Sequence, residues 1–181
     1  MNELRSLAAH LKGEPHVLHN KSEVEDSEEE TILEAFELSK ILIEHIPVVM
    51  VTMGKHGVLL CNRDDITGPL PTKGWISKAS GDMVARHYPS KLDEREGHKI
   101  VSVSGAGDCI ASGVIMSSLN SESPDWGMRV GMACAHRSMK SHKAVPETIT
   151  PKLLMEGKTS KLTGNVVVFP NSKINSERKR A

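Results

Sequence analysis

A glycine turn that ends on a carboxylate is the part of this sequence best suited to chemistry. The apolar run Ile100–Val103 predicts a short strand, the turn Gly105–Gly107 follows it, and residues 108–119 have a helical pattern. Glycines let several backbone N–H groups point the same way, and a helix N-terminus adds about half a positive charge, so the pattern predicts a phosphate site. Asp108 would repel phosphate and is better placed to accept a proton from a group that attacks it. The alternative is a carboxylate that only stabilises the helix dipole.

A second glycine turn joins two more apolar runs. Val48–Thr52 and Val58–Cys61 both have the length of a strand, and Gly54 and Gly57 stand between them. The first run is apolar without alternation, which is typical of a buried strand that could be parallel to its neighbours. Taken alone, the turn fits an ordinary hairpin better than a binding site. The sequence has no complete P-loop, because Lys152 stands where the first glycine would be.

The elements around these turns alternate between helices and strands. Helical patterns cover 3–11, 27–45 and 124–141 and begin again at Pro151, and strand patterns cover 83–88 and 164–169. This order predicts an α/β fold. The segment 171–181 is polar and basic, which predicts a disordered tail.

Composition disfavours several classes of protein. The 181 residues suit one domain, and 23 basic residues balance 23 acidic ones, so neither a nucleic acid nor a membrane surface is indicated as a partner. Aromatic residues make up only 3%, which argues against base stacking. No apolar run approaches the roughly 20 residues that span a bilayer, and the start lacks a secretory apolar segment, so the expected location is the cytoplasm. The three widely spaced cysteines are expected to be reduced thiols in or near the core.

The two glycine turns together resemble the ribokinase (PfkB) carbohydrate kinases. Ser102–Asp108 is similar to the family's C-terminal signature, and Val49–Leu60 resembles the strand, Thr-x-Gly-x-x-Gly turn and strand of its nucleotide side. Both stand in the family's order. The resemblance implies a three-layer α/β/α, Rossmann-like fold that lacks the family's N-terminal strands and lid. Residues 1–170 would be the C-terminal nucleotide-binding part of the kinase domain, followed by the tail.

The resemblance also implies an enzyme that transfers a phosphoryl group from ATP to a primary hydroxyl of a sugar or nucleoside. Asp108 would be the catalytic base, and alignment would matter more than basicity. The other implied site residues bind the substrates: Gly105, Ala106 and Gly107 as an anion hole, and Thr52, Gly54 and Gly57 around the nucleotide. Within the family, the wording of the signature and of Ser138–Pro146 is most similar to pseudouridine kinases, which makes pseudouridine the expected acceptor.

The resemblance implies two kinds of ion. Mg²⁺ would accompany ATP, with Glu3 as the glutamate linked to the magnesium site, or else Glu3 is simply a solvated residue near the N-terminus. Ser102 stands where the family commonly has Asp or Asn, which leaves activation by a monovalent cation open. Because the sugar contacts of the family lie mostly in its N-terminal half, a non-catalytic nucleotide-binding or interaction protein is the alternative function. Homo-oligomer formation is also left open.

Overall fold

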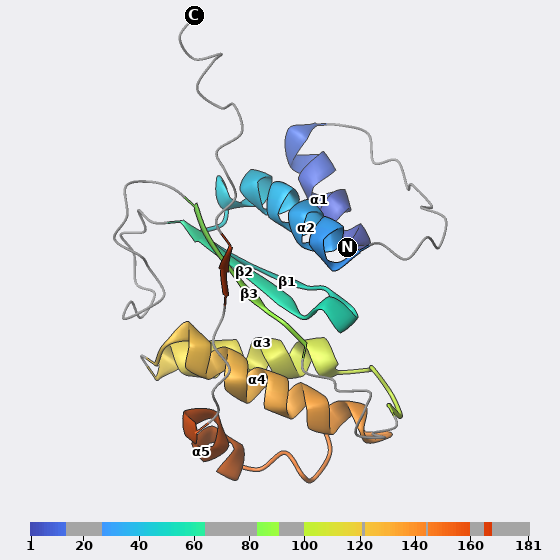
Figure 1. The fold of residues 1–181 in the computed structure, drawn as a ribbon, viewed down its shortest axis with the longest axis vertical. Coiled ribbons are helices and arrows are strands. Elements are labelled where there is room, and N and C mark those ends of the chain that lie inside the picture. Colours follow the sequence, from blue (N-terminus) through green and yellow to red (C-terminus); the bar gives the residue numbers. More distant parts are fainter. Residues whose placement is uncertain are drawn as a thin grey trace, which may run out of the picture.

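In the part of the chain that the structure describes, the sheet has four strands and carries helices on both faces (Figure 1). The computed structural model describes residues 1–13, 27–63, 83–90, 100–120, 122–143, 145–159 and 165–167. The strands are β1 (Val48–Thr52), β2 (Val58–Arg63), β3 (Met83–Tyr88) and β4 (Asn165–Val167). They lie in the order β1-β2-β3-β4, and helices above and below complete the expected three α/β/α layers.

Each described strand pair is antiparallel. In the first pair, Val48 lies opposite Asn62 and Thr52 lies opposite Val58. The suggestion that 48–52 is a parallel strand is therefore wrong for its described neighbour, although the strand itself is confirmed. The reason is the short connection between β1 and β2, since a parallel neighbour needs a crossover of about a dozen residues or more.

Two helices, α1 (Asn2–Lys12) and α2 (Glu28–Ile43), cover one face of the sheet (Figure 1). A capping box starts α2: Ser27 Oγ accepts a hydrogen bond from Glu30 N–H, and the Glu30 carboxylate accepts one from Ser27 N–H. This confirms the helix expected from Ser27 onward. Apolar residues fill the space between α2 and the sheet: Ala35, Phe36, Leu42, Ile43, Val49, Val51, Leu59, Cys61 and Ala85.

The opposite face carries α3 (Ala106–Leu119) and α4 (Pro124–Met139), and α5 (Lys152–Thr159) packs on α4 (Figure 1). These three helices were expected from the sequence. The first two approach closely because glycines face each other: a methyl group at Gly113 would lie 2.4 Å from the Gly131 nitrogen. Met128 of α4 packs against Val58, Leu60 and Tyr88 of the sheet.

The strand predicted at Ile100–Val103 is wrong. This segment joins none of the described strands, and Val103 is 71% exposed. Its backbone turns instead to the end of α4, where the Val101 N–H donates to the Met139 carbonyl at 2.8 Å. An apolar run of strand length therefore serves as the lead-in to α3.

Two further predictions concern the cysteines and the C-terminal segment. Cys61, Cys109 and Cys134 are free thiols, the first two buried and the third half-buried, as expected. The proposed tail at 171–181 lies outside the described residues.

Candidate functional site

The turn between β1 and β2 is a single turn of 3-10 helix, η1 (Gly54–His56). The Met53 N–H donates to the Gly57 carbonyl at 2.8 Å, which closes the turn. Gly57 has a φ of +87°, and a methyl group there would lie 2.1 Å from the Tyr88 carbonyl oxygen. Only glycine fits both the backbone angle and this space. Glycine at position 57 thus allows the turn to pack closely against the end of β3.

The turn before α3 leaves backbone donors available. Gly105 adopts a φ of +81° as the N-cap residue, and no side chain caps the helix. Within the described residues, the N–H groups of Gly105, Gly107 and Asp108 have no hydrogen-bond acceptor, whereas the Ala106 N–H donates to the Val103 carbonyl at 3.3 Å. Gly107 has open space where a side chain would stand. An anion approaching Gly107 at this helix end meets unpaired N–H groups and open space in place of a side chain.

A cavity of about 530 Å³ brings the two turns together. This volume is within the range of small-molecule sites, roughly 300–1,000 Å³. Of the residues predicted from the sequence, Thr52, Gly54, Gly57, Ala106 and Gly107 line it. Gly105 and Asp108 do not line it, but they adjoin Ala106 and Gly107, and the Asp108 side chain is exposed. The predicted nucleotide turn and the predicted anion turn therefore share one cavity.

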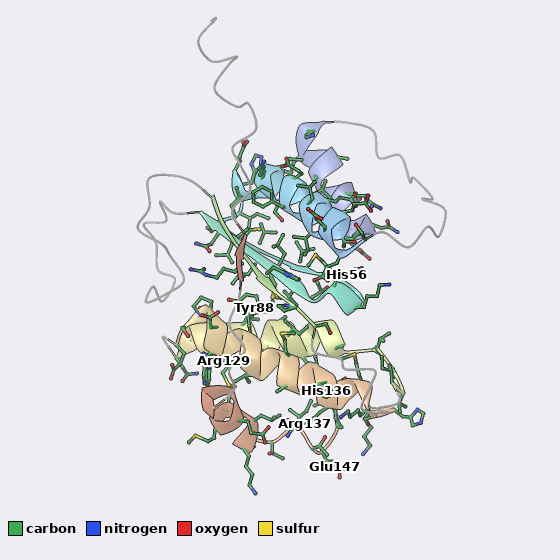
Figure 2. All side chains as sticks on the ribbon, viewed as in Figure 1. His56, Tyr88, Arg129, His136, Arg137 and Glu147 are labelled. Carbon is green, nitrogen blue, oxygen red and sulfur yellow. The ribbon has the colours of Figure 1, made fainter. Side chains whose placement is uncertain are left out.

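Among the residues that the structure describes, three basic side chains line this cavity, and no acidic one does. They are Lys55 beside the first turn and Arg129 and His136 on α4. Figure 2 shows Arg129 and His136 separated along α4. Such a wall attracts a ligand with several negative charges.

Arg129, Asp125 and Tyr88 form a polar cluster that orients the Arg129 side chain. Arg129 Nε donates to the Asp125 carbonyl at 3.0 Å, and the Asp125 carboxylate accepts a hydrogen bond from the Tyr88 hydroxyl at 2.9 Å. Burial, followed by the nearby Asp125 charge, raises the pKa of Tyr88 above its usual range, so Tyr88 stays a neutral donor. The cluster ties the first turns of α4 to the end of β3.

Apolar residues make up much of the remaining wall. Ile100 and Val103 contribute from the segment before α3, and Met132 and Met139 contribute from α4. The sequence analysis did not predict that α4 contributes to the cavity wall. The available signal was the spacing of Arg129, Met132, His136 and Met139, which places them along one side of a helix.

Glu3 is not brought to this site. Its side chain is 96% exposed, its nearest charged partner is the N-terminal amine at 3.7 Å, and it lies on α1, across the sheet from α3 (Figure 1). A backbone hydrogen bond and then the N-terminal charge lower the pKa of Glu3. Among the described residues, no three His, Cys, Asp or Glu side chains could hold a metal ion together. The arrangement therefore offers no ligand set for Mg²⁺ around Glu3.

The fold is similar to solved structures of carbohydrate kinases. A chain assigned as a sugar kinase from Clostridium perfringens matches with a TM-score of 0.54 and 12% identity over 91% of this chain and 41% of its own length. Ribokinase from Thermotoga maritima matches with a TM-score of 0.50 and 18% identity over 87% of this chain and 40% of its own length. At these identities the likeness shows the fold alone, which confirms the ribokinase-like arrangement expected from the sequence. This chain spans about two fifths of the length of these two structures.

No family model matches the sequence, and no curated protein matches it. Within the described part of the chain, none of the helices has the length and apolar character needed to cross a bilayer.

Proposed function

We propose that this chain binds ATP and supplies the phosphoryl-transfer residues of a carbohydrate or nucleoside kinase. The observation that carries the proposal is the cavity between the two glycine turns. The described residues of its lining include three basic side chains and no acidic one. ATP combines a multiply charged triphosphate with a flat apolar base, and the cavity combines cationic side chains and available N–H groups with an apolar wall. The fold shared with two kinase structures supports the same interpretation.

The proposed placement of ATP follows from the cavity wall, which has a basic part and an apolar part. The triphosphate would lie against Lys55 and the N-terminus of α3, where the N–H groups of Gly107 and Asp108 lack an acceptor among the described residues. The base would lie against the apolar wall formed by Met132 and Met139. Aimed donors in oxyanion-hole sites contribute about 3 kcal/mol each to a transition state, and these amides would act in the same way.

Asp108 would act as the base. As the oxygen of the acceptor hydroxyl forms its bond to the γ-phosphorus, its proton passes to the Asp108 carboxylate, and the bond from that phosphorus to the β–γ bridging oxygen breaks to release ADP. A base positioned in this way contributes roughly 10²–10⁴-fold to the rate. The exposed carboxylate of Asp108 is accessible to an acceptor at the helix N-terminus.

The proposal also covers the acceptor of the phosphoryl group and the ions that accompany ATP. Pseudouridine is the best candidate acceptor, on the resemblance of Ser102–Asp108 and Ser138–Pro146 to pseudouridine kinases. Mg²⁺ would enter with ATP, and a monovalent cation stays a prediction from the resemblance. The residues of this chain that are proposed to act in the transfer itself are Asp108 and the amides at the start of α3.

The test is ATP binding by isothermal titration calorimetry, together with ADP release in the presence of pseudouridine, other nucleosides and sugars. Arg129→Gln should weaken ATP binding about tenfold, because it removes a positive charge from the cavity wall that would attract the triphosphate. Arg137→Gln is the matched control: Arg137 lies on the same helix, pairs with Glu156 at 3.0 Å and is not part of the cavity wall. Equal effects of the two variants, or no ATP binding by the unaltered chain, would contradict the proposal. ATP binding without ADP release for every acceptor would favour the alternative of a non-catalytic nucleotide-binding protein.

A further inference from the structure

We infer that His87 is a positioning residue that holds the turn of η1 in the shape required by the cavity. His87 does not line the cavity, so it acts through the turn and not through the ligand. The inference about nucleotide affinity rests on the proposed function, whereas the inference about the turn itself does not.

The contact that carries this inference joins β3 to the turn. His87 is 6% exposed, and its Nε2 lies 2.7 Å from the His56 carbonyl oxygen. A carbonyl oxygen only accepts hydrogen bonds, so Nε2 carries a proton and donates it. The same nitrogen lies 3.9 Å from Glu28 Oε1 at the start of α2. The buried imidazole thus donates to the turn and lies close to the start of α2.

Backbone hydrogen bonds also hold the turn. Met53 N–H donates to the Gly57 carbonyl at 2.8 Å. Two further bonds of 3.1 Å run from His56 N–H to the Met53 carbonyl and from Gly57 N–H to the Gly54 carbonyl. At its far end, Gly57 is pressed against the end of β3. The His87 bond is therefore the side-chain anchor at His56, next to Lys55, which lines the cavity.

Partial burial makes the loss of this bond costly, since His87 is buried and His56 is half-buried. If the His87 donor is removed, the His56 carbonyl must find water or move, and a polar group shielded from water without a partner is destabilising. A movement of the turn displaces Gly54 and Lys55 with it, because they are the preceding residues of the same helical turn. The cavity wall would change although no lining residue had been replaced.

The test compares His87→Leu with His87→Gln. Leucine removes the donor, whereas glutamine places an amide N–H close to the position of Nε2. His87→Leu should weaken ATP binding about fivefold, which corresponds to ~1 kcal/mol for one hydrogen bond, and His87→Gln should recover most of it. Ser39→Ala is the control for general destabilisation, because it removes another buried hydrogen bond, to Ala35, without contact to the turn. It should leave ATP binding unchanged.

Hydrogen exchange of the unliganded chain separates this inference from the proposed function. His87→Leu should speed exchange at the amides of His56 and Gly57 at least fivefold, and His87→Gln and Ser39→Ala should not. Unchanged exchange in His87→Leu would overturn the inference about the turn, whether or not ATP binds. Faster exchange with unchanged ATP affinity would overturn its link to the ligand. A chain that binds no ATP at all would count against the proposed function, while the exchange data would still decide the role of His87.

Discussion

The two faces of the sheet differ in how they are filled. On the α1–α2 face, apolar side chains of α2 pack directly on β1, β2 and β3. On the α3–α4 face, close packing by Met128 gives way to a cavity of about 530 Å³ at the ends of β1 and β3. None of the residues that line this cavity belongs to α1 or α2.

This difference indicates that one face mainly stabilises the fold and the other provides the candidate binding site. A packed face contributes to the free energy of unfolding through buried apolar area, whereas a cavity forgoes some of that burial and leaves donors and charges available to a ligand. His87 is the exception, since it sits on the packed side and contacts the turn that serves the other side. Variants on the two faces should therefore separate stability from binding.

The largest effect is expected on the cavity face. Asp108→Asn should lower the rate of phosphoryl transfer about 10³-fold, because the amide cannot accept the proton, and should leave the ATP dissociation constant within about twofold. Glu147→Gln, which neutralises an exposed carboxylate that pairs with Lys143 and is not part of the cavity wall, is the matched control and should keep its activity. ADP release and calorimetry measure the two quantities. Near-normal turnover in Asp108→Asn would remove Asp108 from the mechanism.

The packed face should respond in stability. Leu42→Ala should lower the free energy of unfolding by about 3 kcal/mol, because Leu42 is fully enclosed between α2 and the sheet. ATP affinity, measured well below the midpoint of unfolding, should not change. Met132→Ala in the cavity wall should do the reverse, with a smaller loss of stability and weaker ATP binding. If Leu42→Ala weakens binding as much as Met132→Ala does, the two faces are not independent.

The cysteines offer a test by pH. Burial raises the pKa of the Cys61 thiol on the packed face to about 11, from a reference value of 9.0. The folded state favours the neutral thiol, so this contribution to stability is complete below pH 9 and is lost as the pH rises through about 11. The loss should reach about 2 kcal/mol. Urea unfolding from pH 8 to 11 should show a smaller decline for Cys61→Ala than for the unaltered chain. Equal declines would mean that Cys61 does not contribute.

The smallest effects concern the helix caps. Ser27→Ala and Ser123→Ala should each lower the free energy of unfolding by about 1 kcal/mol, because each removes an oxygen that caps an N-terminal N–H. Only Ser123→Ala should also weaken ATP binding, since it loosens the start of α4, which carries Arg129. Denaturation and calorimetry on both variants measure this. Equal effects of the two variants on ATP affinity would contradict the view that only the α3–α4 face supports ATP binding.

The sequence by itself determined most of the elements and both turns. The capping box at Ser27, the apolar runs of β1 and β2, and the glycines of the two turns act through bonds and torsions within a few residues. Interactions over so short a range can be predicted from the types of residues that are adjacent in the sequence. The resemblance to a kinase family rested on the same two turns and led to the fold that the solved structures share.

The tertiary structure decided which residues meet. Ile100–Val103 has the composition of a strand, but the end of α4 takes its backbone bond, so the run becomes a lead-in segment. Arg129 and His136 join the cavity because α4 packs beneath the sheet, and Glu3 stays away because α1 lies across it. These outcomes depend on contacts between residues far apart in the chain, and such contacts depend on how whole elements pack, which short-range patterns do not encode.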